Sequence, residues 1–526
     1  MPAKVEVIMD LRSVIEKFKD LGMIVLEEAE TPIWRISPKL WAEDDALFFS
    51  NIKGYPFPIV GNLCNSREKL AASMGVPADE LLREYVKRAG APHAPVTVAT
   101  GPVKDVIYTG DNVDMSIFPV LLQHERDGAP YISSAVDFAR NDKGGHNVGI
   151  RRLMFLSKDE ITFNATSPSD LKALIGKSRE EKRPFEIAFA VGAHPLVYLG
   201  ALTRVPVNDE LSLIGGLFQR ALNTVKCETV DILVPADAEM IIEGLVYPDE
   251  LVNEGPYGEV LGFYGESKVN ARMEITAVTH RKDMIFQTLT AGGDHIWNTD
   301  GAMLSGLRAE LSVWNALKQA VAKPINVFSV PAAGGQLTVR ASIDAQNEGD
   351  GKNALLAVLS CLSNVKCAII TDKDVNIFDG RQVDHEIATK VQPSEDVMII
   401  NNVRAISVDP SLSGRPAPLA GSKMGIDATA SKKLPASTLE HSKPPFSDIY
   451  LNDGNPCQGG SELAGKELED AIYEFVVSSE NGACMFTQIW KNMFSSEYRE
   501  ILSAISRLYK AGKLSKDKAG RFVSKL

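Results

Sequence analysis

The sequence predicts a mixed α/β (α+β) chain of several domains rather than one large core. At 526 residues the chain is too long for a single ordinary hydrophobic core, and about two to four domains are expected. The pattern of apolar residues changes near residues 96, 300 and 465. These changes divide the chain into a small N-terminal α/β domain (1–95), a central β-rich domain (96–300), a C-terminal α/β domain (301–464) and a tail (465–526).

The composition is that of a soluble globular protein, with 44% hydrophobic and 24% charged residues. No apolar run approaches the roughly 20 residues that span a bilayer, so no membrane segment is expected, and the N-terminus lacks the apolar core of a signal peptide. The 6 cysteines are sparse and include no CxxC pair, which favours reduced thiols in a cytoplasmic protein. The net charge of −12 disfavours nucleic acid as the main partner, although the C-terminus is locally basic.

The N-terminal domain is expected to begin with an amphipathic helix. Apolar residues at helical spacing predict one shared buried face, formed by Val14, Ile15, Phe18 and Leu21. Residues 46–63 are typical of strands and turns. A further helix is predicted from residue 78 to a stop at Gly90, followed by a proline-rich linker at 91–95.

The central domain is predicted to be a barrel or another closed sheet, because it combines many short strands with few helices. The clearest strands are 96–99, 105–109, 132–138, 152–156, 186–191, 196–199 and 229–234. A hairpin is predicted at the end of the domain, with strands 269–279 and 284–290 joined by a turn at 281–283.

The C-terminal domain alternates helices and strands, which predicts an α/β layer structure. Helices are expected at 304–321 and 353–363, strands at 325–330, 337–342, 367–371 and 397–401, and loops over 409–464. In the tail, two helical segments at 467–477 and 497–511 precede a short basic end, which is the order of a winged-helix module. A packing or oligomerisation appendage is an equally good interpretation of the tail.

One segment of the central domain carries two carboxylates close together. Residues 253–259 have the sequence NEGPYGE, in which Gly and Pro exclude a helix and favour a rigid loop. Paired carboxylates are a common source of general acid–base chemistry, because each shifts the protonation of the other. Glu254 and Glu259 are therefore candidates for this role. The alternative interpretation is a surface turn with two solvated acids.

A second polar cluster, NVGIRR, occupies residues 147–152 and enters a predicted strand. Arg152 at the start of such a strand can pair with a carboxylate and hold an anionic group in bidentate fashion. Taken alone, an Arg on a strand is more often part of a structural ion pair. Together with the acidic segment, Arg152 predicts a site that binds a carboxylate and moves a proton.

Four segments together resemble the UbiD family of decarboxylases, which use prenylated FMN. They are HERDGAPYI at 124–132, NVGIRR at 147–152, VPADAE at 234–239 with IEG at 242–244, and EGPYGE at 254–259. The segment GSKMGID at 421–427 is similar to the family's C-terminal loop. These segments follow the family's order and spacing over about residues 100–430, so the tail is not part of the resemblance.

The resemblance implies a central split β-barrel that binds the flavin, and reversible non-oxidative decarboxylation of an aromatic, heteroaromatic or α,β-unsaturated acid. In this family the substrate adds covalently to the prenylated flavin, carbon dioxide leaves and a Glu protonates the product. The residues that match the family's catalytic triad are Arg152, Glu254 and Glu259, with Glu259 as the proton donor. The implied cofactor contacts are Asn147, Ile150, Arg152, Thr203 and Lys423.

The resemblance also implies a divalent metal, Mn²⁺ or Mg²⁺, at the cofactor phosphate, with K⁺ as a further cation. Asn147 matches the first metal ligand. The family's His ligand falls on Asp170, and its Glu ligand falls near Leu213, where the closest acid is Glu210. An amide and two acids suit a hard cation.

His295 lies just beyond the predicted hairpin and is a candidate for hydrogen bonding to the substrate, with a structural role as the alternative. The resemblance further implies carbon dioxide as a reaction partner and a flavin prenyltransferase as cofactor supplier. It also implies a homo-oligomer, either a dimer or a hexamer, assembled through the C-terminal domain. Two rival functions are a metal-dependent hydrolase, for which the chain offers no accompanying His cluster, and a nucleic-acid-binding regulator acting through the basic tail.

Overall fold

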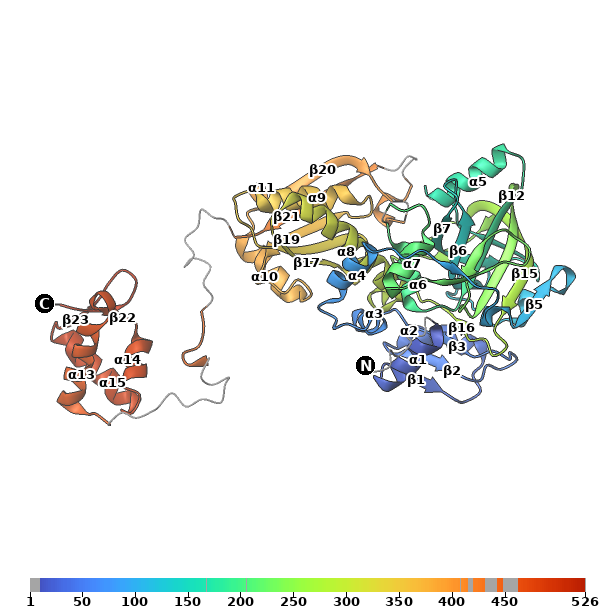
Figure 1. Cartoon of the computed structure of the whole chain (residues 1–526). Coiled ribbons are helices and arrows are strands. Elements are labelled where there is room, and N and C mark those ends of the chain that lie inside the picture. The colour runs from blue at the N-terminus through green and yellow to red at the C-terminus, as the bar shows by residue number, and fades with distance from the viewer. Residues whose placement is uncertain are drawn as a thin grey trace. The chain divides into compact units, whose positions relative to one another are not determined.

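The structure is a computed structural model that describes residues 10–166, 168–204, 206–406, 408–414, 420–430, 442–447 and 462–525. The chain forms two compact units, residues 1–433 and 434–526 (Figure 1). Within these described residues, no helix is both long enough and apolar enough to cross a membrane.

A four-stranded sheet forms the N-terminal part of the first unit. Its strands run in the order β1 (Ile24–Glu27), β2 (Ala46–Phe49), β3 (Ile59–Gly61) and β16 (Phe286–Gln287). The predicted first helix is α1 (Leu11–Asp20), which the Asp10 side chain caps. Three of the four residues predicted for its buried face are buried, but Leu21 is 51% exposed because it follows the last helical residue.

The hairpin predicted at the end of the central domain is wrong. Its first strand is β15 (Lys268–His280), but β16 pairs in parallel with β3 instead of returning along β15. The segment between β15 and β16 contacts α1, where Arg12 Nη1 lies 2.6 Å from Asp283 Oδ2. This contact joins residues 271 positions apart, so a local sequence pattern cannot reveal it.

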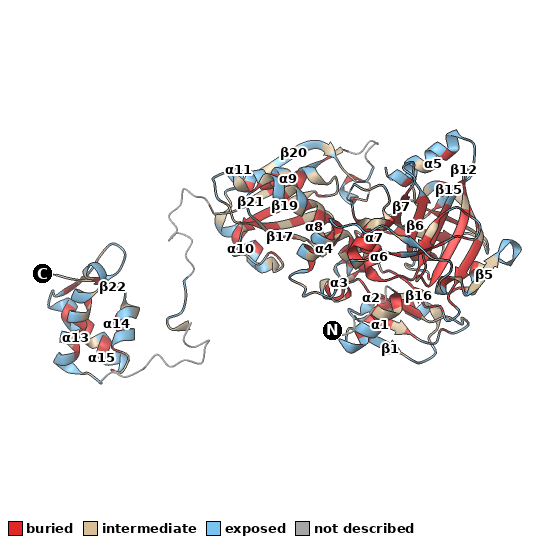
Figure 2. Ribbon diagram, viewed as in Figure 1, coloured by how far each residue is buried: buried red, intermediate tan, exposed pale blue. Residues whose placement is uncertain are grey.

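The central part is a closed barrel, as predicted. Its strands run in the order β12 (Met240–Glu254), β9 (Phe185–Val191), β6 (Tyr131–Arg140), β7 (His146–Phe155), β8 (Glu160–Phe163) and β15. Pairing of β15 with β12 closes the barrel, and β5 (Val106–Thr109) adds to β15. Buried residues line both faces of β6 and β9, because side chains fill the interior and further elements cover the outside (Figure 2).

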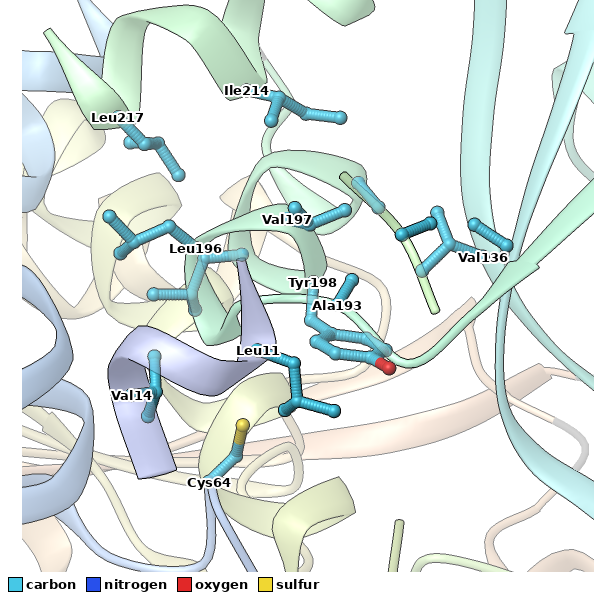
Figure 3. Packing of buried hydrophobic residues seen from close by; sticks show 14 of the residues in the cluster. Leu11, Val14, Cys64, Val136, Ala193, Leu196, Val197, Tyr198, Ile214 and Leu217 are labelled. Atoms are coloured by element: carbon cyan, nitrogen blue, oxygen red, sulfur yellow. The ribbon is translucent and has the colours of Figure 1, made fainter. Parts of the chain in front are cut away.

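One predicted strand, 196–199, is instead part of α6 (Pro195–Leu202). Pro195 occupies the first turn, where a missing N–H costs nothing, and the His194 ring accepts a hydrogen bond from the Leu196 N–H. The helix is buried among α1, α7 (Leu211–Phe218) and strand β6 (Figure 3). A helix that is apolar on all sides has no amphipathic period, so its sequence resembles that of a buried strand.

The strands predicted at 96–99 and 229–234 belong to a separate small sheet. Its order is β11 (Leu233–Pro235), β10 (Asn223–Lys226) and β4 (Val96–Thr97). The strands predicted at 96–99 and 229–234 are therefore shorter than expected and lie outside the barrel.

The C-terminal part of the first unit is an α/β layer structure, as predicted. Its sheet has the order β17 (Pro324–Ser329), β18 (Thr338–Ile343), β19 (Cys367–Asp372), β21 (Ala420–Ala428) and β20 (Val397–Arg404). Helices α8 (Asp300–Ala320) and α9 (Asp350–Cys361) share a hydrophobic core with this sheet. Helix α10 (Gly380–Lys390) lies in a segment for which the sequence predicted no element.

The segment 421–427, interpreted as a loop, is a strand between β19 and β20. The buried positions along β21 begin with Gly421, Lys423 and Gly425 instead of apolar side chains, which hides the alternation of a strand. Gly425 allows α9 to pack closely, because a Cβ at this position would lie 3.0 Å from Leu355.

The second unit has its own small hydrophobic core. Its elements are α13 (Gly465–Ser478), β22 (Ala483–Cys484), α14 (Phe486–Asn492), α15 (Tyr498–Lys510), β23 (Leu514–Lys516) and β24 (Phe522–Ser524). The strands pair in the order β22, β24, β23. This is the element order of a winged helix, as predicted for the tail. Most of the segment 431–461, predicted to be loop-rich, lies outside the described residues.

Candidate functional site

The Arg152 side chain on β7 contacts both carboxylates of the acidic segment. Arg152 Nε and Nη2 lie 2.8 and 3.3 Å from the two carboxylate oxygens of Glu254, and Arg152 Nη1 lies 2.9 Å from Glu259 Oε1. Glu254 is the last residue of β12, and Glu259 follows the turn after it. The fold thus brings together three residues that the sequence placed in one site.

The two carboxylates have different surroundings. The Glu254 side chain is fully buried and also accepts a hydrogen bond from Tyr131 Oη at 3.1 Å. The Glu259 side chain keeps 13% of its surface exposed, and Lys268 Nζ lies 3.7 Å from it. Burial by itself lowers the Arg152 pKa, but Glu259 and Glu254 raise it above its ordinary value, so the guanidinium stays charged.

Several neighbouring residues contact the turn between the carboxylates. Gly255 has φ of 95°, which glycine adopts without strain. The Gly258 N–H donates to Asp127 Oδ1 at 3.0 Å, and a Cβ at Gly258 would lie 2.4 Å from the His124 ring. Tyr257 lies under the guanidinium, with 4.5 Å between Arg152 Cζ and the ring centroid. The HERDGAPYI segment, to which the sequence assigned no role, therefore positions this turn.

Arg151, next to the site, is part of a separate ion pair. Its Nε lies 3.2 Å from an oxygen of Asp137, a fully buried carboxylate on β6. Burial raises the Asp137 pKa, and the charges on Arg151 and Arg204 oppose this effect. Removal of Arg151 would leave a buried acid without its counter-charge, which is strongly destabilising.

The three predicted metal ligands lie along one cleft of about 470 Å³. The Asn147 amide nitrogen and the Val148 N–H both donate to Glu210 Oε2, at 3.1 and 2.6 Å. Burial raises the Glu210 pKa, and the nearby charge on Asp170 raises it further. Carboxylate and amide oxygens suit a hard cation. However, no cluster of three or more His, Cys, Asp and Glu that could hold a metal occurs in the described part of the chain.

Two arginines that the sequence did not single out influence each other's charge, and one of them lies on this cleft. Arg204, the residue after the predicted contact Thr203, lines the cleft. The Arg308 side chain on α8 has neither a hydrogen bond nor an ion pair with any described residue, and burial and the charge on Arg204 lower its pKa. Tyr85 Oη, which both arginines influence, lies 2.9 Å from Thr203 Oγ1. A partly buried guanidinium without a carboxylate partner is favoured in its charged form by a bound anion.

The other predicted residues lie elsewhere in the first unit. Ile150 pairs with Val136 across β7 and β6, on the strand that carries Arg152. Lys423 Nζ donates to two carbonyl groups at the end of α9, those of Leu359 and Leu362.

His295 packs between Trp41 and Trp297, with ring centroids 4.7 and 5.3 Å apart, and its side chain is 49% exposed. The described contacts of His295 and Lys423 include neither Arg152 nor the residues of the cleft. Their functional roles stay predictions.

Three family models match the first unit. The model described as the 3-octaprenyl-4-hydroxybenzoate carboxy-lyase Rift-related domain matches residues 95–294. The N-terminal and C-terminal domain models of the same carboxy-lyase match residues 32–89 and 302–428. None of the three extends into the winged helix.

Similar proteins and structures agree with these models. Anhydromevalonate phosphate decarboxylase of Methanothermobacter thermautotrophicus is 30% identical over 423 residues, covering 80% of this chain and 96% of that protein. The UbiD-class enzyme HmfF from Pelotomaculum thermopropionicum, in complex with FMN, is 33% identical with a TM-score of 0.78, covering 84% of this chain and 99% of HmfF. An evolved dimeric form of HmfF with prFMN is 31% identical with a TM-score of 0.75, covering 85% and 100% of the two chains. The chain therefore belongs to the UbiD family of carboxy-lyases, as its motifs indicated, and is a decarboxylase.

Proposed function

We propose that this protein reversibly decarboxylates an aromatic, heteroaromatic or α,β-unsaturated carboxylic acid, without net oxidation, with prenylated FMN as cofactor. The observation that carries the proposal is the Arg152 guanidinium shared between Glu254 and Glu259. When bound, the cofactor supplies an electron sink for the charge that remains as carbon dioxide leaves. Supply of the cofactor by a flavin prenyltransferase and assembly into a homo-oligomer belong to the same proposal.

The chain's own residues fit such a cofactor at both of its ends. Asn147 and Arg152 are five residues apart on β7, which is about 17 Å along a strand. The cleft at the Asn147 end offers Arg204, with Arg308 nearby, to a phosphate. The Arg152 end offers the acid–base groups to the reacting ring and substrate. The phosphate would thus bind at one end of β7 and the reaction would occur at the other, with the backbone around Ile150 between them.

Arg152 has hydrogen-bonding capacity left for a substrate. A guanidinium carries five N–H groups, and three of them bind Glu254 and Glu259. One N–H on each terminal nitrogen remains, and such a pair matches the two oxygens of a carboxylate. We assign Arg152 the role of orienting the substrate carboxylate for departure.

Glu259 is better suited than Glu254 to carry the proton. Glu254 accepts three hydrogen bonds, from Tyr131 and twice from Arg152, and is fully buried. These contacts fix Glu254 as the group that orients Arg152. Glu259 has a single hydrogen bond from Arg152 and a partly exposed carboxyl group, so it can exchange its proton with a product carbon.

Replacement of Arg152 by Lys tests the bridging role. Lys keeps the charge but cannot bind both carboxylates and a substrate with one planar group. Loss of one charged hydrogen bond costs about 1.5–3 kcal/mol, so kcat/KM for decarboxylation should fall at least roughly tenfold to 100-fold. The matched control is Arg140→Lys, at an exposed position on β6, which should leave kcat/KM unchanged. Wild-type kcat/KM in Arg152→Lys would contradict the assignment.

Replacement of Glu259 by Gln tests the proton carrier. Gln keeps the shape and a hydrogen-bond donor but has no transferable proton, so turnover should fall by about 10²–10⁴-fold. The variant should also fail to exchange the product's ring or vinyl hydrogen with deuterated solvent, as followed by NMR or mass spectrometry. Wild-type exchange in this variant would mean that another group carries the proton, with Glu254 the first to examine.

The contribution of Arg204 and Arg308 to phosphate binding is tested by comparing the affinity for FMN with the affinity for riboflavin, which lacks the phosphate. Arg308→Gln should weaken FMN binding about 10–100-fold, because it removes a charged contact worth about 1.5–3 kcal/mol, and should leave riboflavin binding unchanged. Quenching of flavin fluorescence measures both affinities. Arg381→Gln, at a position with 91% of the side chain exposed, is the matched control.

Treatment with a chelator distinguishes the contribution of the predicted metal to FMN binding from that of the arginines. If a cation at Asn147, Asp170 and Glu210 carries the phosphate, exhaustive chelation should weaken FMN binding and added Mn²⁺ should restore it. Unchanged FMN affinity in Arg308→Gln would contradict the role of the arginine, and unchanged affinity after chelation would contradict the metal.

A further inference from the structure

The second unit presents one exposed helix face next to a short hairpin. Helix α15 buries one face in the core of the unit, through Ile501, Ala504, Ile505 and Leu508. Its opposite face is exposed and carries Tyr498, Arg499, Leu502, Ser506, Tyr509 and Lys510. Helix α14 precedes it across a short turn, so the pair is a helix–turn–helix, and the hairpin of β23 and β24 follows.

Charge is strongly segregated within this unit. Residues 497–525 contain eight Lys and Arg residues but only three Asp and Glu residues. Residues 465–496 contain two Lys residues and five Asp and Glu residues. The acids of the unit neutralise two of the eight cations, because Glu469 on α13 pairs with Arg507 and Asp517 pairs with Arg521. The spacing of Glu500 places it on the same side of α15 as Arg507, away from Arg499.

Six cations remain that have no ion pair with an acid among the described residues. They are Arg499, Lys510, Lys513, Lys516, Lys518 and Lys525. All six are exposed, and they lie on α15 or on the hairpin that follows it. The chain as a whole has a net charge of −12, so this positive surface is local and opposite in sign to the rest of the protein.

We infer that the second unit binds double-stranded DNA, with α15 in the major groove and the β23–β24 hairpin against the phosphates. A basic helix face beside a basic hairpin is the electrostatic footprint of nucleic-acid binding. In helix–turn–helix proteins the N-terminal residues of the second helix contact the base edges, which here are Tyr498, Arg499 and Leu502. The hairpin lysines are placed to contact phosphates, which gives affinity without sequence information.

DNA fits this face better than duplex RNA does. The major groove of B-DNA admits an α-helix, whereas the major groove of an RNA duplex is too deep and narrow for side chains to be read there. A unit that uses the face of α15 should therefore prefer DNA. This DNA site is distinct from the decarboxylase site, which lies wholly within residues 1–433.

The test is fluorescence anisotropy of a labelled DNA duplex of mixed sequence, about 30 base pairs long, titrated with the full-length protein. Binding is expected at about 50 mM salt and should weaken steeply at about 200 mM, because each neutralised phosphate contributes about −0.9 to the slope of log K against log salt. The double variant Lys516→Ala/Lys518→Ala should weaken binding and reduce that slope by about 2. Lys466→Ala on α13 removes the same kind of charge from the acidic half and should bind as the wild type does.

Several outcomes would overturn the inference. Absence of salt-dependent binding up to about 100 µM protein at low salt would do so, and so would wild-type binding by the double variant. Equal affinity for an RNA duplex would contradict docking in the major groove. Association of two copies through this face, without any DNA binding, would make it a protein interface instead. Arg499→Ala gives a second variant if the double variant alters the circular dichroism spectrum, and unchanged FMN binding shows that the first unit is intact.

Discussion

The guanidinium of Arg152, shared between two carboxylates, is the interaction on which the site depends. Residues 240–246 of β12 pair with β9, whereas residues 251–254 pair with β15 alone. The end of β12 therefore runs beyond the barrel as part of a two-stranded ribbon. This ribbon and the turn that follows it bring Glu254 and Glu259 to Arg152 on β7. Closure of the barrel by the β12–β15 pairing is thus a condition for the proposed chemistry, as well as for the fold.

Three positions in the structure offer cationic groups to an anion. Arg152 keeps two N–H groups free of its carboxylate partners. Arg308 has no acid partner among the described residues although burial disfavours its charge. Residues 497–525 carry six cations without an ion pair to an acid among the described residues, in a chain with a net charge of −12. A buried or concentrated positive charge is costly unless an anion compensates it, so these positions are the strongest structural indications of ligands.

The sequence predicted the parts of the structure that local patterns control. The triad residues Arg152, Glu254 and Glu259 lie in short motifs whose Gly-Pro turn and strand context are visible in the chain itself. The barrel and the winged helix followed from the order of strands and helices. Long-range effects escaped prediction. Strand β16 pairs with the distant strand β3, and the connection before β16 contacts Arg12 across 271 positions. Strand β21 carries glycines where a strand usually carries apolar residues. Arg308 could be recognised only once the fold showed that its side chain has no hydrogen-bond or ion-pair partner in the described part of the chain.

The central claim is that the barrel and its Arg–Glu–Glu network serve a prenylated flavin. The most direct test is the visible absorption spectrum of the full-length protein purified after co-production with a flavin prenyltransferase, followed by mass spectrometry of the released cofactor. The expected result is a coloured protein that releases a flavin heavier than FMN by one prenyl group, at about one equivalent per chain. A colourless protein with no bound flavin after such co-production would contradict the claim.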